Sequence, residues 1–448
     1  MKFLPTLLAA LLTATLPTAA QLTVNGLTTV YDENTGTYLC SIDSSDFGRD
    51  YTATIRSTSS AWRNVTIDGT AVTLGTKYTF ASVSAGKTYA LTASIGDTAI
   101  SGQIAFTYLP ILQAKGSFST TYSVGKLRVI VPDESGESDL RAKIKWRGTA
   151  AEEGQKHNYH IKFIKSDGTK KNRDFFGLRS DNSWLLNAAR KDLSRVRNRV
   201  ATDLWLDMAS KPYYHPYDTT AQPGVGGVMV EFFVGNDYRG VYSFTETMDR
   251  KQMGLTNYSE PSLEINGMIF KADDTTDQTL MTAGATFDNT VESQYGFTVK
   301  YPDIEDVTPT DYPVLSNAID FVANSSDDDF TALVADYFDL PVVADYIIFV
   351  QSLLAVNNDG KNIYWGCYDI NKDKKLTLGV WDLDSSVGQS KDTSDPHSSD
   401  VSPTTDLTLL NRLFARLKSL NPNGFYDDLV ARYRTLQGYN VLHPMGYD

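Results

Sequence analysis

The chain is poor in the residues that build disulfide scaffolds and zinc sites. Its 448 residues include only two cysteines, Cys40 and Cys367, and five histidines. A disulfide scaffold needs many cysteines in a short chain, so we expect two buried thiols, with a single bridge between them as the alternative. His157 and His160 are near neighbours, but no histidines pair at the spacing of zinc ligands, and we expect them on strand surfaces.

Positive charge is also scarce, and several catalytic signatures are missing. Lys and Arg number 41 against 54 Asp and Glu, which gives a formal net charge of -13. Nucleic acids and anionic membranes select clustered Lys and Arg, so neither is an expected partner. The sequence has no Gly-x-Ser-x-Gly turn and no phosphate loop ending in Gly-Lys-Ser/Thr. Among 54 acids, no pair can be singled out as the carboxylates of a glycosidase.

The only long apolar run lies in residues 1–20 and has the form of a signal peptide. Lys2 provides the positive end, "FLPTLLAALLTATL" the apolar stretch, and "TAA" a small-residue cleavage site before Gln21. No cysteine follows the run, which disfavours a bacterial lipid anchor. We therefore expect an exported protein, either secreted, periplasmic or on the cell surface, with no transmembrane segment in the mature chain.

Residues 21–110 contain short runs rich in Thr, Val, Ile and Tyr, with turn residues about every ten positions. This pattern predicts an antiparallel β-sandwich of the immunoglobulin-like kind, serving as a spacer or attachment module. From residue 111 to residue 448 the pattern becomes α+β. The predicted strands there are Lys126–Val131, Leu140–Arg147, Tyr159–Lys165, Val228–Val234 and Arg239–Glu246.

Helices are predicted between and after these strands. In residues 194–208 the apolar spacing places Val196, Val200, Leu204 and Met208 on one helical face, with Ser194 available as an N-cap. Residues 311–324 and 339–356 also have helical periodicity, and the acidic run 325–329 is expected to cap the helix between them rather than to bind calcium. Two further helices are expected near the end of the chain, after a polar, mobile loop that begins near residue 389.

The segment 355–388 carries the strongest candidate site. Asp359 and Asn362 precede a predicted β-hairpin, and Asp382 and Asp384 follow it. Because the two strands of a hairpin are antiparallel, the residues before the first strand lie beside those after the second. Three carboxylates and an amide so close together would repel unless a cation lay among them, and oxygen ligands suit Mg²⁺ or Mn²⁺. The alternatives are ordinary surface turns or a structural calcium loop.

These residues and several earlier segments resemble the CotH kinase family, whose members are secreted or spore-coat proteins with an atypical protein-kinase fold. The resemblance covers about Lys115 to Leu436, in the family's order, and does not include the N-terminal module. The matching segments are "AKIKWRGTAAEEGQKHNYHIKF", "DFFGLRSDNSWLLNAARKDLSRVRNRVATDL", "VMVEFFVGNDYRGVYSFTETMD", "VKYPD" and "DLPVVADYIIFVQSLLAVNND". The resemblance implies a two-lobed kinase-like domain in residues 111–448 that binds ATP with Mg²⁺ or Mn²⁺.

The resemblance also implies roles for individual residues. Asp359 would receive or orient the proton of the acceptor hydroxyl, and Asn362 and Asp382 would bind metal, with Asp384 in a supporting or second-metal role. Lys162 would contact the α- and β-phosphates, although a half-buried strand also explains its alternation with apolar neighbours. Lys145 and Arg147 would form a basic wall, or a surface cation pair. Arg197 would bind phosphate or tether its helix, with a solvated basic face shared with Arg195 and Arg199 as the alternative. Glu246 would orient the adenine-binding segment or pair with a cation, and Trp381 would pack in the core.

Two features depart from the kinase pattern. Asp359 and Asn362 are separated by only two residues, so Asn357 and Asn358 remain alternatives to Asn362 as the metal ligand. Glu152 and Glu153 place negative charge in the turn after the first phosphate-facing strand, which opposes nucleotide binding unless they point outward. The resemblance implies a secreted kinase that phosphorylates Ser or Thr hydroxyls of a protein outside the cytoplasm. Because of these departures, a catalytically weak or inactive cell-surface protein that acts in binding or adhesion is the alternative.

Overall fold

The structure is a computed structural model that describes residues 21–134, 138–148, 156–259, 262, 264–303, 312–389, 406–407 and 409–438. It divides into two compact units. One comprises Met1–Gln155, His160–Lys171 and Met229–Tyr242, and the other comprises Lys156–Tyr159, Asn172–Val228 and Ser243–Asp448. The predicted signal peptide and most of the polar loop after residue 389 lie outside the described residues. No helix in the described part of the chain is long and apolar enough to span a membrane.

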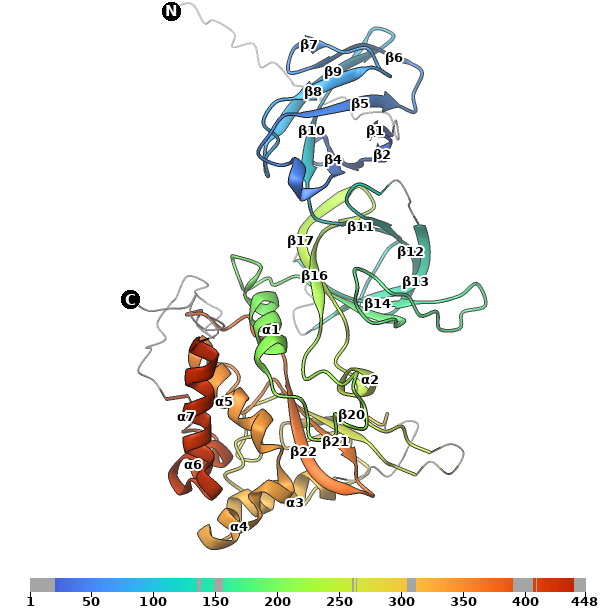
Figure 1. The fold of residues 1–448 in the computed structure, drawn as a ribbon. Helices are drawn as coiled ribbons and strands as arrows, with labels where there is room; N and C mark the ends of the chain where they lie inside the picture. Colours follow the sequence, from blue (N-terminus) through green and yellow to red (C-terminus); the bar gives the residue numbers. More distant parts are fainter. Residues whose placement is uncertain are drawn as a thin grey trace, which may run out of the picture. The chain divides into compact units, whose positions relative to one another are not determined.

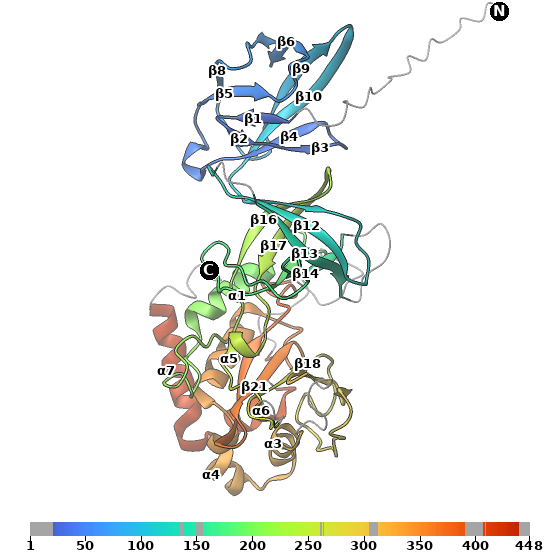
Figure 2. The ribbon, with the colours of Figure 1, turned by 90° about the vertical axis from the view of Figure 1, so that its right-hand side faces the viewer.

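The N-terminal region is built from two β-sheets around one apolar core, as Figure 2 shows. Its strands alternate buried and exposed residues, because successive side chains of a strand point to opposite faces of the sheet. The thiol of Cys40 is free and buried in this core, and Cys367 is likewise free and buried in the second unit, so the prediction of two unpaired thiols is confirmed. The two sheets are, in order, β2 (Leu27–Thr28), β1 (Leu22–Val24), β5 (Tyr51–Ser57) and β8 (Lys77–Phe80), and β3 (Val30–Asp32), β4 (Thr37–Ser41), β10 (Thr98–Thr107), β9 (Thr88–Ile95), β6 (Trp62–Ile67) and β7 (Thr70–Ala71).

Seven further strands form a closed barrel. All five strands predicted between residues 126 and 246 are present, each within three residues of its expected bounds. The barrel closes through a parallel pairing of its first strand with the first strand of its last hairpin. The order around it is β11 (Ile111–Lys115), β12 (Ser123–Ile130), β13 (Ser138–Arg147), β14 (Asn158–Phe163), β15 (Ser183–Asn187), β17 (Asp237–Thr245) and β16 (Gly227–Val234).

Within the first unit, the N-terminal sheets pack directly on the barrel hairpin β16–β17. A small apolar cluster joins Val30 of β3 to Ile111, Ile130 and Phe233 of the barrel. Three hydrogen bonds fasten the turn after β3 to the hairpin: Glu33 N to the Asn236 carbonyl at 2.9 Å, Asn34 Nδ2 to Asp237 Oδ1 at 2.9 Å, and Tyr238 N to Asp32 Oδ1 at 3.3 Å. The N-terminal region is therefore attached to the barrel by a packed interface.

The second unit is centred on a five-stranded antiparallel sheet that the β21–β22 hairpin forms with three strands not predicted from the sequence (Figure 1). Helices pack against this sheet in one apolar core. The acidic run 325–329 caps one of the helices as predicted, since the Ser326 side chain accepts from Asp329 N. The sheet order is β19 (Ser293–Gln294), β20 (Phe297–Tyr301), β18 (Met268–Ala272), β21 (Ile363–Asp369) and β22 (Asp373–Val380). The helices are α1 (Arg197–Met208), α2 (Arg250–Met253), α3 (Pro313–Asn324), α4 (Asp327–Tyr337), α5 (Leu340–Leu353), α6 (Arg412–Leu420) and α7 (Phe425–Gly438).

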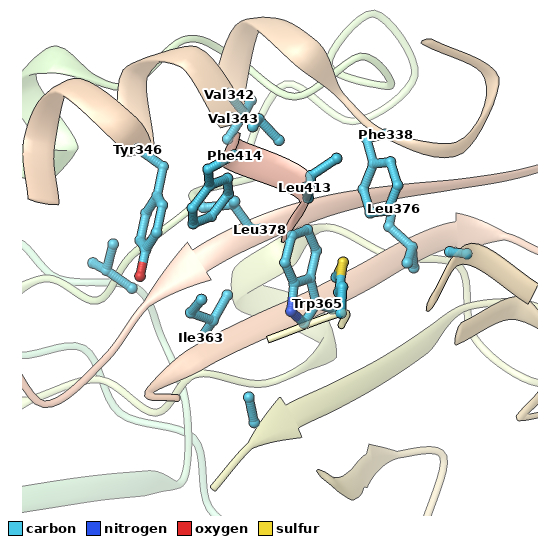
Figure 3. Packing of buried hydrophobic residues seen from close by; sticks show 14 of the residues in the cluster. Phe338, Val342, Val343, Tyr346, Ile363, Trp365, Leu376, Leu378, Leu413 and Phe414 are labelled. Atoms are coloured by element: carbon cyan, nitrogen blue, oxygen red, sulfur yellow. The ribbon is translucent and has the colours of Figure 1, made fainter. Parts of the chain in front are cut away.

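The largest apolar core lies between this sheet and its helices. Trp365 of β21 is fully buried beside Leu378 of β22, while Tyr346 of α5 and Phe414 of α6 approach from the helical side, as Figure 3 shows. Aromatic and aliphatic side chains of this size contribute most of the burial free energy of a core. The α5 helix and the hairpin that follows it are thus held at their centres, and the loop between them starts from a fixed position.

Helix α1 does not bury the face that the sequence predicts. Val196 and Val200 are 39% and 50% exposed, and of the predicted face only Met208 is fully buried. The buried residues are instead Arg199, Ala201, Thr202, Trp205 and Met208. Trp205 decides the orientation, because its large indole is completely buried and its N–H donates to the Pro223 carbonyl at 3.0 Å.

Candidate functional site

The loop after α5 carries Asp359 and is fixed by two buried side chains. The Tyr346 hydroxyl of α5 donates to the Asn358 carbonyl at 2.6 Å, and the Asn411 side chain, which caps α6, donates from Nδ2 to the Asp359 carbonyl at 3.2 Å. Gly360 follows in close contact with Leu280, whose Cδ2 would lie 2.5 Å from an added Cβ. Asp359 itself is 5% exposed, so the loop backbone around this carboxylate has little freedom.

Asn358 links this loop to the far end of the hairpin. Its side chain is completely buried, and Nδ2 donates to the Trp381 carbonyl at 2.9 Å. The pairing of Ile363 with Val380 in the β21–β22 register brings the same two segments together. The sequence-based expectation that the hairpin joins the residues before and after it therefore holds for the backbone. The expected close group of three carboxylates is wrong, because Asp359, Asp382 and Asp384, all within the described residues, do not form a group that could hold a metal ion by itself. Sequence analysis named Asn358 only as an alternative metal ligand and missed this connecting role.

The other predicted amide, Asn362, immediately precedes β21 and has a left-handed backbone conformation with φ 59°. It is 5% exposed, its backbone N–H donates to the Ala272 carbonyl at 2.7 Å, and its Nδ2 donates to the Asn357 carbonyl at 3.1 Å. The side-chain nitrogen of Asn362 is thus engaged in a hydrogen bond to the protein backbone. Metal binding through the amide oxygen of Asn362 stays a prediction.

Asp382 and Asp384 lie together after β22. Asp382 is half-buried and adopts a left-handed conformation with φ 53°, which is uncommon for a residue other than glycine. Burial, as the largest cause, and the neighbouring charge of Asp382 together raise the pKa of the Asp384 carboxyl to about 7, with a smaller contribution from Asp192, while Lys191 acts in the opposite direction. The site therefore gathers carboxylates whose mutual repulsion a cation would relieve.

Asp192 was not predicted from the sequence, yet it organises the start of α1. It is completely buried and accepts hydrogen bonds from Arg197 N at 2.9 Å, Arg197 Nη1 at 2.6 Å, and Ser194 N and Oγ at 2.9 and 2.7 Å. Burial alone would raise the pKa of Asp192, but these hydrogen bonds outweigh it and lower the pKa. The expected N-cap, Ser194, is wrong; the helix follows Val196, and the Asp192 carboxylate accepts its first N–H. These contacts support the helix-tether alternative for Arg197.

Arg199, which the sequence analysis passed over in favour of Arg197, faces a small polar cavity. Its side chain is buried, and Nη2 pairs with Asp203 at 2.6 Å. The cavity has a volume of about 20 Å³, and its walls include Asp382 and Ser243. Such a volume holds about one water molecule. The i, i+3 spacing of Arg199, Thr202 and Trp205 is the signal that could have placed Arg199 on the buried side of α1.

The predicted basic residues of the barrel converge in the first unit. Lys145 and Arg147 alternate along β13, and Lys162 lies on β14, which neighbours β13. The Nζ atoms of Lys145 and Lys162 lie 4.7 and 5.2 Å from the ring centre of Tyr122. The three cations, together with burial as the largest cause, lower the pKa of His160 to about 3. We name Tyr122, Lys145, Arg147, His160 and Lys162 the basic cluster.

Two sequence predictions near this cluster have different outcomes. His157 is buried, so its placement on a strand surface is wrong, whereas His160 lies on the half-exposed face of β14. Glu152 and Glu153, whose charge could oppose nucleotide binding, lie outside the described residues.

Glu246 lies at the end of β17, in the second unit, where it joins backbone segments. It is 6% exposed; one carboxylate oxygen accepts from Arg179 N at 2.8 Å, and the other accepts from Gly226 N at 2.8 Å and Gln252 Nε2 at 2.9 Å. Its described hydrogen-bond partners are two backbone amides and a neutral side chain. Trp381, the expected core residue, is partly buried against Tyr364 and also lines the small cavity beside Asp382.

A comparison with protein families identifies the chain. Residues 144–432 match the model of the family described as CotH kinase protein. The chain belongs to the CotH kinase family. The match begins on β13 and ends in α7, so it contains the acidic residues after β22, the loop of Asp359 and most of the basic cluster. A comparison with curated proteins gave no match.

The acidic side of the site fits a divalent ion of the kind that a CotH kinase fold implies. Within the described residues, no three His, Cys, Asp or Glu side chains gather closely enough to enclose a metal ion by themselves. Mg²⁺ in phosphoryl-transfer sites commonly binds through one or two carboxylates, with phosphate oxygens and waters as the other ligands. Asp382 and Asp384 supply two such carboxylates, and the charge of Asp382 raises the pKa of Asp384. The residues present suit a metal shared with a nucleotide.

Proposed function

We propose that this protein is an exported kinase that transfers the γ-phosphoryl group of ATP to Ser or Thr hydroxyls of a protein outside the cytoplasm. Family membership supports kinase-like chemistry. The observation that carries the proposal is the Asn358–Trp381 hydrogen bond, because it fastens the Asp359 loop to the turn of Asp382 and Asp384. Phosphoryl transfer depends mainly on positioning and on charge stabilisation, and a rigid pair of acidic segments serves both.

The residues take the following roles in this proposal. The acceptor hydroxyl oxygen attacks the γ-phosphorus, the bond from that phosphorus to the β–γ bridging oxygen breaks, and ADP leaves. The Asp359 carboxylate accepts the hydroxyl proton. Asp382 and Asp384 would hold a divalent ion, with Asn362 as the predicted third ligand, and such an ion would supply positive charge beside the transferred group.

The basic cluster suits an anionic ligand. Lys162 binds the α- and β-phosphates, and Lys145 and Arg147 add positive charge on the same strands. The gathering of Lys145 and Lys162 around one ring supports this role, because like charges brought so close favour an anion among them. Arg197, engaged with Asp192, contributes by holding α1 in place, and Glu246 by joining the loops of Arg179 and Gly226.

Radiolabelled phosphoryl transfer tests the proposal. The full chain, incubated with γ-labelled ATP and Mn²⁺, is expected to label a generic Ser/Thr-containing acceptor or itself. Asp359→Asn should reduce the rate by roughly 10²- to 10⁴-fold, the usual contribution of a general base. Asp336→Asn, which changes an exposed carboxylate of α4, is the matched control and should leave the rate unchanged. Absence of transfer by the unaltered chain, or transfer by Asp359→Asn at the same rate, contradicts the proposal.

A further inference from the structure

Tyr122 lies at the centre of the basic cluster, although sequence analysis gave it no role. It immediately precedes β12, and the pairing of Ser123 with Ile144 brings Tyr122 beside Lys145, the next residue of β13. Its ring is half-buried. The aromatic side chain of one strand end thus meets the cations of β13 and β14.

The Tyr122 ring contacts two ammonium groups at once. Lys145 Nζ is 4.7 Å and Lys162 Nζ is 5.2 Å from the ring centre, both within the range of about 6 Å over which a cation is attracted to an aromatic face. Two ammonium groups repel each other, and the negative face of the ring offsets part of that repulsion. The ring therefore allows two lysines of neighbouring strands to converge.

The orientation of the ring is fixed by His160. The Tyr122 hydroxyl lies 2.9 Å from His160 Nδ1. His160 is neutral at physiological pH, since burial and the nearby cations lower its pKa to about 3, and burial raises the pKa of Tyr122 to about 12. A neutral imidazole with its proton on Nε2 accepts the phenolic hydrogen at Nδ1. The bond therefore adds no charge to the basic cluster.

We propose that Tyr122 is a positioning residue whose ring, held by His160, orients Lys145 and Lys162 toward the phosphate chain of the nucleotide. The identity of the ligand rests on the proposed function. The orientation of the lysines does not, because it follows from the ring contacts. Tyr122 acts through the two lysines and need not contact the nucleotide.

A pair of variants separates the ring from the hydroxyl. Tyr122→Phe keeps the aromatic face, and Tyr122→Leu removes it. We expect Tyr122→Leu to weaken Mn²⁺–ATP binding about tenfold and to raise KM for ATP more than it changes kcat, while Tyr122→Phe stays within about threefold of the unaltered chain. Tyr108→Leu, which removes a half-exposed tyrosine of the first unit, is the control for loss of packing. Equal affinities in Tyr122→Leu and the unaltered chain overturn the proposal.

Lysine reactivity gives a second test that needs no nucleotide. Acylation with a small anhydride, read by mass spectrometry, reports the accessibility of each amine. In Tyr122→Leu we expect the rates at Lys145 and Lys162 to rise by at least about twofold, because the ring that covers and attracts them is gone, with no change at exposed Lys77. Tyr122→Met, which fills more of the space without a ring, makes the same comparison if Tyr122→Leu does not fold.

The ATP-binding and acylation experiments distinguish the proposed kinase function from the positioning role of Tyr122. If the unaltered chain does not bind Mn²⁺–ATP, the proposed function fails, and the acylation rates alone decide the role of Tyr122. Unchanged rates at Lys145 and Lys162 in Tyr122→Leu overturn the positioning role whether or not ATP binds. Raised rates together with weakened ATP binding support both claims.

Discussion

Asn358 donates a hydrogen bond from its buried side chain to the backbone carbonyl of Trp381, across 2.9 Å. The bond connects the residue before Asp359 to the residue before Asp382. Two carboxylates that lie 23 positions apart in the sequence are thereby attached to one rigid piece of backbone. The catalytic proposal depends on this attachment more than on the identity of any single ligand.

Replacing Asn358 with Ala should loosen this attachment. The Trp381 carbonyl would lose its donor in a buried place, which costs about 1–3 kcal/mol of unfolding free energy. We expect a lower denaturation midpoint in urea and a lower rate of phosphoryl transfer. Asn317→Ala, at an exposed asparagine of α3, is the control and should change neither. The same midpoint and rate in Asn358→Ala and the unaltered chain would show that the bond is dispensable.

Arg197→Ala tests whether this arginine holds the helix or the nucleotide. Removing it leaves the buried Asp192 carboxylate without its ion-pair partner, and since Arg197 is partly exposed we expect a loss of roughly 1–3 kcal/mol in unfolding free energy. The Kd for Mn²⁺–ATP should stay within about twofold, a change worth less than 0.5 kcal/mol. Arg190→Ala, an exposed arginine nearby, is the control. Unchanged stability with a tenfold weaker Kd would instead make Arg197 a phosphate ligand.

The pH dependence of stability should include a contribution from Asp339, which precedes α5. Burial raises its pKa from the ordinary 3.8 to about 6, against hydrogen bonds from Tyr213 N at 2.9 Å and Thr377 Oγ1 at 3.0 Å. Between these two pKa values the folded state holds a proton that the unfolded state has lost. The stability contributed by the protonated carboxyl is therefore complete below pH 4 and lost as the pH rises to about 6.

Asp339→Asn should remove this fall in stability, because an amide does not titrate. Each pKa unit corresponds to about 1.4 kcal/mol, so the effect is at most about 3 kcal/mol between pH 4 and pH 7. Melting temperatures of the variant and the unaltered chain, measured across this range, make the comparison. Parallel curves would show that the Asp339 carboxyl titrates alike in the folded and unfolded states.

The N-terminal sheets should stabilise the barrel. A chain that begins at residue 111 would expose Ile111 and Phe233, which are completely buried in the full chain. Exposing large apolar side chains costs about 1.5–3 kcal/mol each, so we expect a lower melting temperature and increased binding of a hydrophobic dye. Val30→Ala makes a smaller change at the same interface, with exposed Val124→Ala as its control. Equal melting temperatures for the full and shortened chains would contradict a stabilising interface.

The parts of the fold that local sequence decides were predictable. The turn "NKDKK" separates two apolar strands, and these strands form the β21–β22 hairpin. The acidic run 325–329 lies at the start of α4, where the helix dipole favours negative charge. The buried face of α1 was not predictable from spacing alone. Val196 and Val200 have the right period, but the single indole of Trp205 buries more surface and turns the valines outward.

The contacts that the sequence could not reveal join residues that are distant along the chain. The charge of Asp192 raises the pKa of Asp384, although 192 positions separate the two residues in the sequence. No local pattern marks Asp192 as a buried carboxylate. Tyr122 meets His160 only because β12, β13 and β14 are successive strands of the barrel. The family resemblance pointed to the candidate lysines and aspartates of the site. The roles of Asp192 and Tyr122 depend on tertiary packing, which the sequence does not show.

The central claim is that Asp382 and Asp384 hold a divalent ion that a nucleotide shares. Thermal unfolding of the full chain with millimolar ATP and Mn²⁺ tests it most directly, because a ligand at 100 times its Kd stabilises the folded state by about 2.7 kcal/mol. We predict a rise of several degrees in Tm that requires both ATP and Mn²⁺, persists in Asp336→Asn and is absent in Asp382→Asn. No rise in the unaltered chain, or an equal rise in Asp382→Asn, would contradict the claim.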